Sequence, residues 1–390
     1  MISLVNSTIK NEDIDALIDW LGTYPRLTKG EQTKAFEKEW SEWLGTKYSV
    51  FVNSGSSALL LMYYTLIESG RMKNKKVVIP ALSWSTDLAP AIQLGLEPIL
   101  CDCNMDDLSV SLEHLEEIFN KENPSALMLV SVMGLPPKMN EIQDLCTKYG
   151  VLLLEDCCEA TGAEWCGQKV GTFGLMSAFS FYFGHHMSTI EGGMISTNSA
   201  NLYNLLVSMR SHGWDRDWSQ TMQTTAQQKY TVSSFDSMFT FYYPGFNLRS
   251  TDLQAFIGRK QLRRLDKTIV RRRENFDLYA KSLIEHAWKP TLCGAQMDHS
   301  SFNYPIIDRQ RNEIAQALMD EEVEVRPLIC GSLDRQPFYI DKYPPVSGLV
   351  NSSYVKDSGM FVPNNPDITE EDIKKITGII NAVMGYGAIE

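Results

Sequence analysis

The stretch 177–197, SAFSFYFGHHMSTIEGGMIST, decides how the rest of the chain is interpreted. Its residues 178–183 are apolar enough to form a buried strand, and two adjacent histidines, His185 and His186, follow them. A Gly-Gly pair and a second apolar run end the stretch. In α/β enzymes, ligand-binding side chains gather in this way where buried strands end. The stretch therefore predicts a functional site at the end of a sheet.

Short apolar runs alternate with helical patterns on both sides of this stretch. Such alternation predicts a mostly parallel sheet of about seven strands, covered by helices on both faces, in an α/β fold. The helical patterns include residues 112–120 and 139–149, which have apolar residues at helical spacing. The expected strands are residues 48–52, 76–80, 97–102, 127–133, 151–155, 178–183 and 194–197.

Three parts of the chain are expected from these patterns. Residues 1–28 form an N-terminal arm with one helix, residues 29–261 a large α/β domain, and residues 262–390 a small C-terminal α+β domain. Residues 252–285 are helical and rich in arginine, and we expect one long helix there with a solvated, ion-paired face. The small domain should contain strands at 302–307 and 323–327 and a last helix from about Thr369 to Met384.

Composition and charge limit the possible functions. The 390 residues include 36 basic and 48 acidic side chains, for a net charge of −12. This balance argues against a nucleic-acid surface, but it does not exclude a phosphorylated ligand bound by backbone amides. The chain has neither a signal-peptide pattern nor an apolar run long enough to span a membrane, so we expect a cytoplasmic protein with reduced cysteines. The close pairs Cys101/Cys103 and Cys157/Cys158 are interpreted as small buried residues.

Several further motifs follow predicted strands. The turn NSGSS at 53–57 joins a strand to a helix, and it predicts either a phosphate-binding cup or a simple serine cap of that helix. Asp156 ends another strand, where a carboxylate can bind a metal, act as a base or hold a protonated ring nitrogen. Trp84 can cover a flat ring, or it can pack in the core. Together with His185, this set suits pyridoxal phosphate (PLP), which needs phosphate anchorage, ring stacking, a partner for the pyridine nitrogen and an acid/base group.

These motifs resemble the DegT/DnrJ/EryC1/StrS family of sugar aminotransferases and dehydratases, which are fold-type I PLP enzymes of the aspartate aminotransferase type. The resemblance covers nearly the whole chain and keeps the order of the motifs. It rests on NSGSSALLL (53–61), PALSWST (80–86), EDCCEATGAEWCGQKVGTFG (155–174), SFYFGHHMSTIEGG (180–193), RSHGWDR (210–216) and PGFNLRSTDLQAFIG (244–258).

The resemblance implies a role for individual residues of the cofactor site. Trp84 is implied to stack on the pyridine ring, Asp156 to hold the ring nitrogen and Glu159 to lie near the ring hydroxyl. Asn247 is implied to reach the phosphate from the neighbouring subunit, so the resemblance also implies a homodimer with a shared active site. The implied phosphate ligands of the same subunit are Gly55, Ser56, Ser57 and Ser180.

One departure from the family pattern points to the reaction. The aminotransferases of this family carry a lysine that bonds covalently to the cofactor, five residues after the serine that matches Ser180. His185 stands at that position here. An imidazole cannot form that bond, but it can move a proton near neutral pH. The resemblance therefore narrows to the histidine-bearing 3-dehydratases, with His185 and Asp156 as catalytic residues.

These dehydratases imply a specific activity. Non-covalent PLP is converted to pyridoxamine phosphate (PMP) with L-glutamate as the amino donor, and the C3 hydroxyl of a nucleotide-linked 4-keto-6-deoxyhexose is removed. GDP-4-keto-6-deoxymannose is the favoured substrate, as in the colitose branch of 3,6-dideoxysugar and lipopolysaccharide O-antigen biosynthesis. His186, His212 and Arg326 are weaker candidates for contacts to this substrate.

Other functions remain open at this point. A sister group carries an iron–sulfur cluster on cysteines downstream of the double histidine, but this chain has no cysteine between Cys166 and Cys293, so no such cluster and no other metal is expected. One alternative is a 3-dehydratase or aminotransferase-like enzyme that acts on a CDP-, dTDP- or UDP-linked 4-keto sugar. Another is a catalytically dead PLP-fold protein with a binding or regulatory role.

Overall fold

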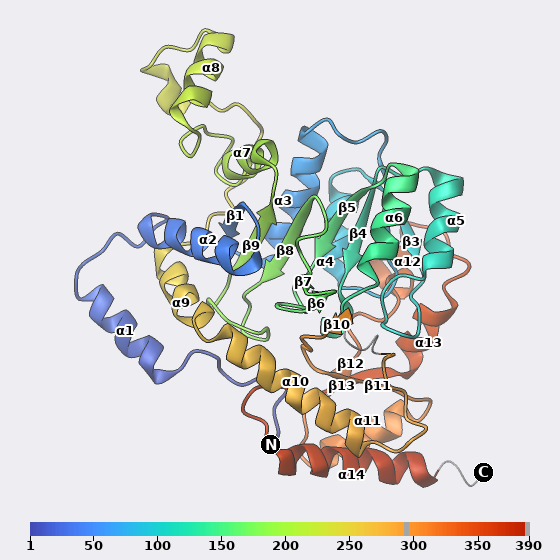
Figure 1. Ribbon diagram of the computed structural model, residues 1–390. Helices are drawn as coiled ribbons and strands as arrows, with labels where there is room; N and C mark the ends of the chain where they lie inside the picture. The colour runs from blue at the N-terminus through green and yellow to red at the C-terminus, as the bar shows by residue number, and fades with distance from the viewer. Residues whose placement is uncertain (292–295, 387–390) are drawn as a thin grey trace.

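The computed structural model describes residues 1–291 and 296–386, so Cys293 lies outside the described residues. A seven-stranded sheet forms its centre, in the order β1-β9-β8-β5-β4-β2-β3 (Figure 1). β9 runs antiparallel to its neighbours β1 and β8, whereas the other pairs of adjacent strands are parallel. The strands are β1 (Tyr48–Val52), β2 (Lys76–Pro80), β3 (Glu97–Cys101), β4 (Ala126–Val130), β5 (Leu152–Asp156), β8 (Met176–Ser180) and β9 (Gly193–Thr197).

Helices cover both faces of this sheet because successive strand residues point to opposite sides. Ala126 and Met128 of β4 join the core beneath α3, α4 and α7, whereas Leu127 and Leu129 pack with α5 and α6. A third, aromatic cluster lies beneath α2 and α9. The helices are α2 (Glu31–Leu44), α3 (Gly55–Glu68), α4 (Ser85–Gln93), α5 (Leu112–Glu122), α6 (Met139–Tyr149), α7 (Ala200–Met209) and α9 (Asp252–Leu262), and α1 (Asn11–Leu21) precedes them. The mostly parallel α/β fold is confirmed.

A second, antiparallel sheet of three strands, in the order β11-β13-β12, lies in the C-terminal part. Apolar residues of α10, α11 and α14 pack against it as a separate core. The elements of this C-terminal part are α10 (Leu265–Ser282), β11 (Tyr304–Ile307), α11 (Arg311–Asp320), β12 (Arg326–Pro327), α12 (Pro337–Ile340), α13 (Val350–Ser358), β13 (Gly359–Val362) and α14 (Glu370–Tyr386). A small sheet joins β6 (Glu164–Trp165), β7 (Gln168–Lys169) and β10 (Met297–Asp298). The predicted domain boundary at residue 262 stays a prediction.

Some predicted elements end elsewhere. The expected single helix over 252–285 is wrong, because Arg264 leaves the helical conformation (φ −118°) and separates α9 from α10. The expected strand 127–133 ends at Val130, since residues 132–134 form a 3₁₀ turn in which Met133 has a φ of +55°. The expected strand 178–183 ends at Ser180, and the next residues turn toward His185, whose N–H donates to the Tyr182 carbonyl.

The segment between α7 and α9 stands away from the rest of the molecule (Figure 1). It contains α8 (Gln220–Tyr230) and a 3₁₀ turn at Asp236–Phe239, and neither buries a residue. Within the described part of the chain, no helix combines the length and the apolar character needed to cross a bilayer.

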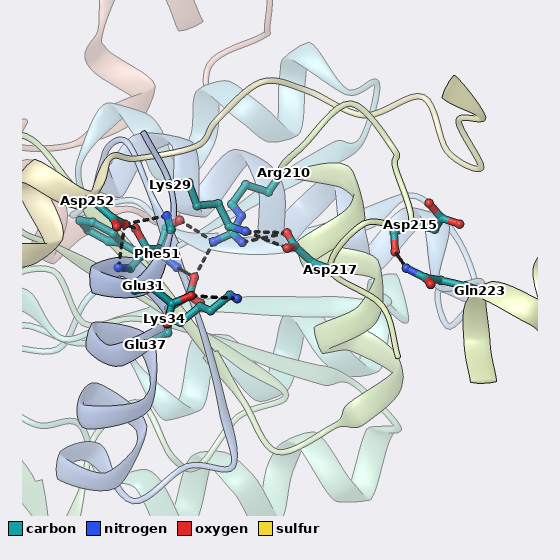
Figure 2. Close-up of polar contacts among 12 residues, drawn as sticks. Lys29, Glu31, Lys34, Glu37, Phe51, Arg210, Asp215, Asp217, Gln223 and Asp252 are labelled. Atoms are coloured by element: carbon teal, nitrogen blue, oxygen red, sulfur yellow. Dashed lines mark hydrogen bonds and ion pairs between the residues drawn. The ribbon is translucent and has the colours of Figure 1, made fainter. Parts of the chain in front are cut away.

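Buried charges anchor the start of this segment at the edge of the sheet (Figure 2). Arg210, the first residue of the RSHGWDR motif, is fully buried, and its Nη1 donates to Glu37 and to the Phe51 carbonyl, 2.8 Å away. Asp217 lies 3.5 Å from Arg210 and also pairs with Lys29 at 2.8 Å. Each charge in this cluster therefore has an opposite charge, and the cluster ties α2, β1 and the end of α7 together.

Candidate active site

A cavity of about 450 Å³ opens where the central strands end. Four segments that follow β1, β2, β5 and β8 bring their side chains to it, as expected for the carboxyl edge of an open α/β sheet. The predicted site residues that line the cavity are Gly55, Ser56, Trp84, Asp156, Glu159, Ser180, His185 and Arg326. Eight of the residues predicted from the sequence therefore line one cavity.

The N-terminus of α3 forms one end of the cavity. Ser54 caps this helix, because its Oγ accepts a hydrogen bond from the Ser57 amide at 3.0 Å. The helix start presents free N–H groups and a positive dipole end, which suit an anion. A Cβ at Gly55 would lie 2.6 Å from Ser180 Cβ and 3.2 Å from Cys158 Sγ, so only glycine lets the helix approach this closely. The turn is thus both a serine cap and a cradle with the shape of a phosphate cup.

Another part of the cavity wall carries carboxyl groups and is called the carboxyl end below. Asp156 is buried, and its Oδ1 accepts a hydrogen bond from the Cys158 amide at 2.8 Å. Glu159 Oε2 accepts from the Met133 amide at 2.8 Å. Burial raises the pKa of Asp156 above its ordinary value, and it raises the pKa of Glu159 to about 7. Buried carboxyls of this kind are suited to bind groups that carry a proton or a positive charge.

Trp84 precedes the first turn of α4 and is 52% exposed, although it lines the cavity. It is absent from the buried core clusters, so the core-packing interpretation of this residue is not supported. An indole with a free face beside a cavity can stack on a flat ring. The aromatic wall, the helix N-terminus and the carboxyl end could together hold an aromatic ring that bears a phosphate.

His185 also lines the cavity. Its ring centre is 5.2 Å from that of Phe302, and its Nδ1 is buried without a hydrogen-bond partner among the described residues. Burial, and after it the positive charge of Arg272, lower the pKa of His185 to about 4. The imidazole is therefore neutral at physiological pH, which is the form that can accept a proton.

His186 does not line the cavity, unlike its neighbour. Its Nε2 lies 3.0 Å from both the carbonyl and the Oγ of Ser300, and its side chain is buried. Burial and the charge of Arg272 hold the pKa of His186 well below its ordinary range. The structure thus gives His186 a packing contact with the 299–303 segment, and its predicted contact with a substrate stays a prediction.

Arg272 is a functional candidate that the sequence did not reveal. The arginine-rich stretch was expected to be solvated and ion-paired, and Arg259 and Arg264 are indeed ion-paired, although their side chains are half-buried. This expectation is wrong for Arg272, which is fully buried and donates to the carbonyls of Phe302 (2.6 Å) and Asn364 (2.8 Å). This guanidinium therefore holds the segment that carries Phe302, and its charge adds to the effect of burial in lowering the pKa values of His185 and His186.

Three other predicted residues lie outside the cavity wall. Asn247 Oδ1 accepts from Arg249 Nε at 3.0 Å, and Arg249 Nη2 lies 3.4 Å from His212 Nε2. The Ser57 side chain is engaged with the helix cap at Ser54. Asn247 and His212 thus form a polar group with Arg249 that does not reach the cavity of their own chain.

The sequence also missed much of the wall. Some of these residues lie inside the motifs quoted above but had no role assigned to them, and the others come from segments that carry no motif. Cys158, Glu191 and Thr86 add polar atoms, and two aromatic rings, Phe302 and Phe361, enter from the C-terminal part of the chain. The remaining missed residues are Ser54, Leu59, Val130, Tyr182, Pro327 and Ile329. Among the described residues no cluster suited to a metal ion is found.

The model of the DegT/DnrJ/EryC1/StrS aminotransferase family matches residues 7–381 of the chain. The chain belongs to this family. It is 30% identical over 387 residues to GDP-4-keto-6-deoxy-D-mannose 3-dehydratase from Yersinia pseudotuberculosis, an alignment that covers 97% of both chains. It is 32% identical over 352 residues to the enzyme of that name from Escherichia coli O55:H7, with 87% of this chain and 89% of the relative covered.

Solved structures agree with this family membership. A crystal structure of GDP-4-keto-6-deoxymannose-3-dehydratase with a trapped PLP-glutamate geminal diamine superposes with a TM-score of 0.88. The two chains are 28% identical, and the superposition covers 97% of this chain and all of the other. The family and its fold-type I architecture, expected from the motifs, are therefore confirmed.

Proposed function

We propose that this chain is a PLP- and PMP-dependent dehydratase that removes the C3 hydroxyl of a nucleotide-linked 4-keto-6-deoxyhexose. GDP-4-keto-6-deoxymannose is the favoured substrate, since relatives that cover nearly the whole chain are named for that sugar. L-Glutamate is the proposed amino donor. The proposed products are the 3,6-dideoxy-4-keto sugar, 2-oxoglutarate and ammonia. No water is consumed overall, because the water released from the sugar is used again in the hydrolysis that releases ammonia.

The identity of the basic residue in the cavity carries this proposal. Of the described residues that line the cavity none is a lysine, and His185 occupies the position at which the family's aminotransferases have one. A secondary ring nitrogen cannot form the covalent link that a lysine forms. A neutral imidazole with an unpartnered Nδ1 can accept a proton. These properties favour elimination over transfer of the amino group to the sugar.

The residues present fit the proposed cofactor. The start of α3, with Gly55 and Ser56, and the hydroxyl of Ser180 would bind its phosphate, and Trp84 would cover its ring. Asp156 would hold the ring nitrogen, and Glu159 the ring hydroxyl. When bound as the amine, the cofactor supplies the nitrogen that condenses with the sugar ketone and a ring that delocalises negative charge.

This chain's own residues would supply the proton transfers and the dry surroundings. His185 would take the proton from the carbon that carries the cofactor's nitrogen, because its neutral form persists at physiological pH. Phe302 and Phe361, which line the same space, would exclude water from it and so strengthen the electrostatic interactions there. Arg326, which is exposed at the cavity wall, is a proposed contact to the sugar nucleotide.

We also propose a homodimer in which each subunit completes the other's site. Asn247, implied to bind the cofactor phosphate, does not reach the cavity of its own chain. Its neighbours Arg249 and His212 would accompany it into the partner's site. Sedimentation of the purified protein, with Asn247→Ala assayed for cofactor affinity, tests this arrangement.

Incubation with a panel of nucleotide sugars tests the proposed reaction. Purified protein, PLP and glutamate would be mixed with GDP-, CDP-, dTDP- and UDP-linked 4-keto-6-deoxysugars, and the masses of the products would be measured by mass spectrometry. The proposal predicts a sugar with one oxygen atom fewer, formed fastest from the GDP-linked substrate, together with 2-oxoglutarate. Formation of an amino sugar would instead indicate an aminotransferase, and no reaction of glutamate with the cofactor would indicate a binding protein.

A further inference from the structure

The first residues of the chain pair with the segment that leads into β12, in the C-terminal part of the molecule (Figure 1). The amide of Ile2 donates to the Glu322 carbonyl at 2.8 Å, and the carbonyl of Ile2 accepts from the Glu324 amide at 2.9 Å. These bonds make a parallel bridge between Ile2 and Val323. The start of the chain is thereby attached to the segment that carries Arg326, the proposed contact to the sugar nucleotide.

The next two residues of the N-terminal arm pack beside the cavity wall. Leu4 is buried in an apolar cluster that also contains Phe361, a residue of the wall. Val5 packs against the same cluster, and a methyl group added at Gly184, the residue before His185, would lie 3.7 Å from Val5 Cγ2. The packing of Leu4 and Val5 therefore fixes the position of the arm next to the cavity.

The side chain of Glu324 joins the arm to Arg326. Its Oε2 accepts a hydrogen bond from the Leu4 amide at 3.0 Å, and its Oε1 accepts from Arg326 Nη2 at 2.9 Å. Glu324 is half-buried, whereas Arg326 is exposed. Within the described residues this is the only hydrogen bond of the Arg326 guanidinium. Since a guanidinium has five N–H donors, the others remain available to a ligand.

Arg326 also has a distinct place among the charges of the cavity. Of the described residues that line it, Arg326 is the only lysine or arginine, and the wall also carries the carboxyl side chains of Asp156, Glu159 and Glu191. A nucleotide-linked sugar carries a negatively charged diphosphate, for which a guanidinium is a suitable partner. A long, exposed arginine loses conformational freedom when it binds. A carboxylate that already holds one of its nitrogens reduces that loss.

We propose that Glu324 is a positioning residue that, held by the amide of Leu4, orients Arg326 toward the diphosphate of the nucleotide sugar. The inference rests on the proposed contact between Arg326 and the sugar nucleotide. Glu324 acts through Arg326 and does not contact the substrate, because its carboxylate would repel a diphosphate. Nucleotide binding should therefore depend on the N-terminal arm. Binding of PLP should not, because neither the arm nor Glu324 is among the residues proposed to hold the cofactor.

Substitutions on both sides of the Glu324–Leu4 hydrogen bond test this role. Glu324 accepts on both oxygens, whereas a glutamine has only one acceptor, so Glu324→Gln loses one of the two bonds at nearly unchanged volume. Glu321→Gln is the matched control, since Glu321 is an exposed carboxylate of the same segment that pairs with Lys375. Leu4→Pro removes the amide donor, and Leu4→Ala shortens the same side chain but keeps that donor. Melting temperatures show which variants are folded, and Glu324→Gln keeps the test decisive if Leu4→Pro does not fold.

The readout is the affinity for a nucleoside diphosphate, measured by isothermal titration calorimetry. GDP, CDP, dTDP and UDP would be compared, and the one that the wild-type protein binds most tightly would be used throughout. We expect Glu324→Gln to bind it about 3- to 10-fold more weakly, whereas Glu321→Gln should bind it as the wild type does. Leu4→Pro should bind more weakly than Leu4→Ala. In an Arg326→Gln background, Glu324→Gln should cause no further loss, because it acts through the arginine.

The outcomes separate this inference from the proposed function. Unchanged or tighter binding in Glu324→Gln, or an equal loss with and without Arg326, would overturn the inference. If Arg326→Gln alone still weakens binding in that case, the proposed contact of Arg326 stands. If Arg326→Gln binds as tightly as the wild type, or if no nucleotide binds, the contact and the inference fail together. If the affinities change as expected but no sugar is dehydrated, only the proposed reaction fails.

Discussion

Two buried charge clusters of this molecule differ in how their charges are matched. At the Arg210 cluster (Figure 2), the guanidinium meets Glu37 and Asp217, and Asp217 meets Lys29. In the cavity, the carboxyls of the buried Asp156 and the half-buried Glu159 have no cation paired with them among the described residues, and the Nδ1 of His185 is buried there without a hydrogen-bond partner. Charges matched within the chain support the fold, whereas unmatched ones mark the place where a ligand supplies the missing partner.

The largest expected effect comes from replacing the two adjacent histidines, His185 and His186, one at a time. In His185→Asn the proposed base is lost, and we expect the dehydration rate to fall by roughly 10²–10⁴-fold. His186→Asn should mainly affect stability, because His186 is bonded to Ser300 rather than exposed to the cavity. Single-turnover assays and melting temperatures of both variants check this. A similar loss of rate in the two variants would contradict the separate roles.

Substitutions in the Arg210 cluster should change the stability of the fold. Arg210→Met leaves the buried Glu37 without its guanidinium, and we expect a loss of about 3–5 kcal/mol in the free energy of unfolding. Arg216→Met, six residues later, removes an exposed arginine that stacks on Trp214, and it should change that free energy by no more than about 0.5 kcal/mol. Urea unfolding measures both. Equal effects would show that charge matching at Arg210 does not stabilise the fold.

The pH dependence of kcat/KM tests whether His185 is kept neutral in the cavity. Since burial and then Arg272 depress the pKa of His185 to about 4, the neutral form persists well below the ordinary value of 6.5. The acid limb of kcat/KM should therefore lie below pH 6. In Arg272→Met a positive charge is removed, so the pKa of His185 should rise and the acid limb should move to higher pH. Arg273→Met is the matched control.

Arg273 is suited to that control because its Nη1 is paired with Asp298 and it does not act on His185. Its loss should leave the position of the acid limb unchanged, even if stability falls. A wild-type acid limb near pH 6.5, or the same shift in both variants, would show that Arg272 does not tune the histidine.

The smallest expected effects concern two glycines. Gly55→Ala places a methyl group 2.6 Å from Ser180 Cβ, so the phosphate end must move, and PLP should bind about ten- to a hundredfold more weakly. Gly378→Ala in α14 has open space around the added group, and it should stabilise the fold by about 0.5–1 kcal/mol. Equilibrium dialysis and thermal melts test these two outcomes. Unchanged PLP affinity in Gly55→Ala would argue against a phosphate at this end.

Site residues could be predicted from the sequence where a chemically reactive side chain directly follows an apolar, strand-like run. Asp156, Ser180 and His185 each follow an apolar run, so the edge of the sheet to which they belong could be predicted. Arg272 could not, because a run of arginines on a helix has the same pattern whether a given side chain is solvated or enters the core. The contact between Phe302 and His185 joins residues more than a hundred positions apart.

The fate of the glutamate nitrogen tests the central claim most directly. The claim is that a histidine in place of a covalently bound lysine directs the site toward loss of the C3 hydroxyl. With ¹⁵N-glutamate, PLP and GDP-4-keto-6-deoxymannose, the wild-type protein should release the label as ammonia and leave a nitrogen-free sugar with one oxygen fewer. Recovery of the ¹⁵N label in a 4-amino sugar that still carries its C3 oxygen would contradict the account.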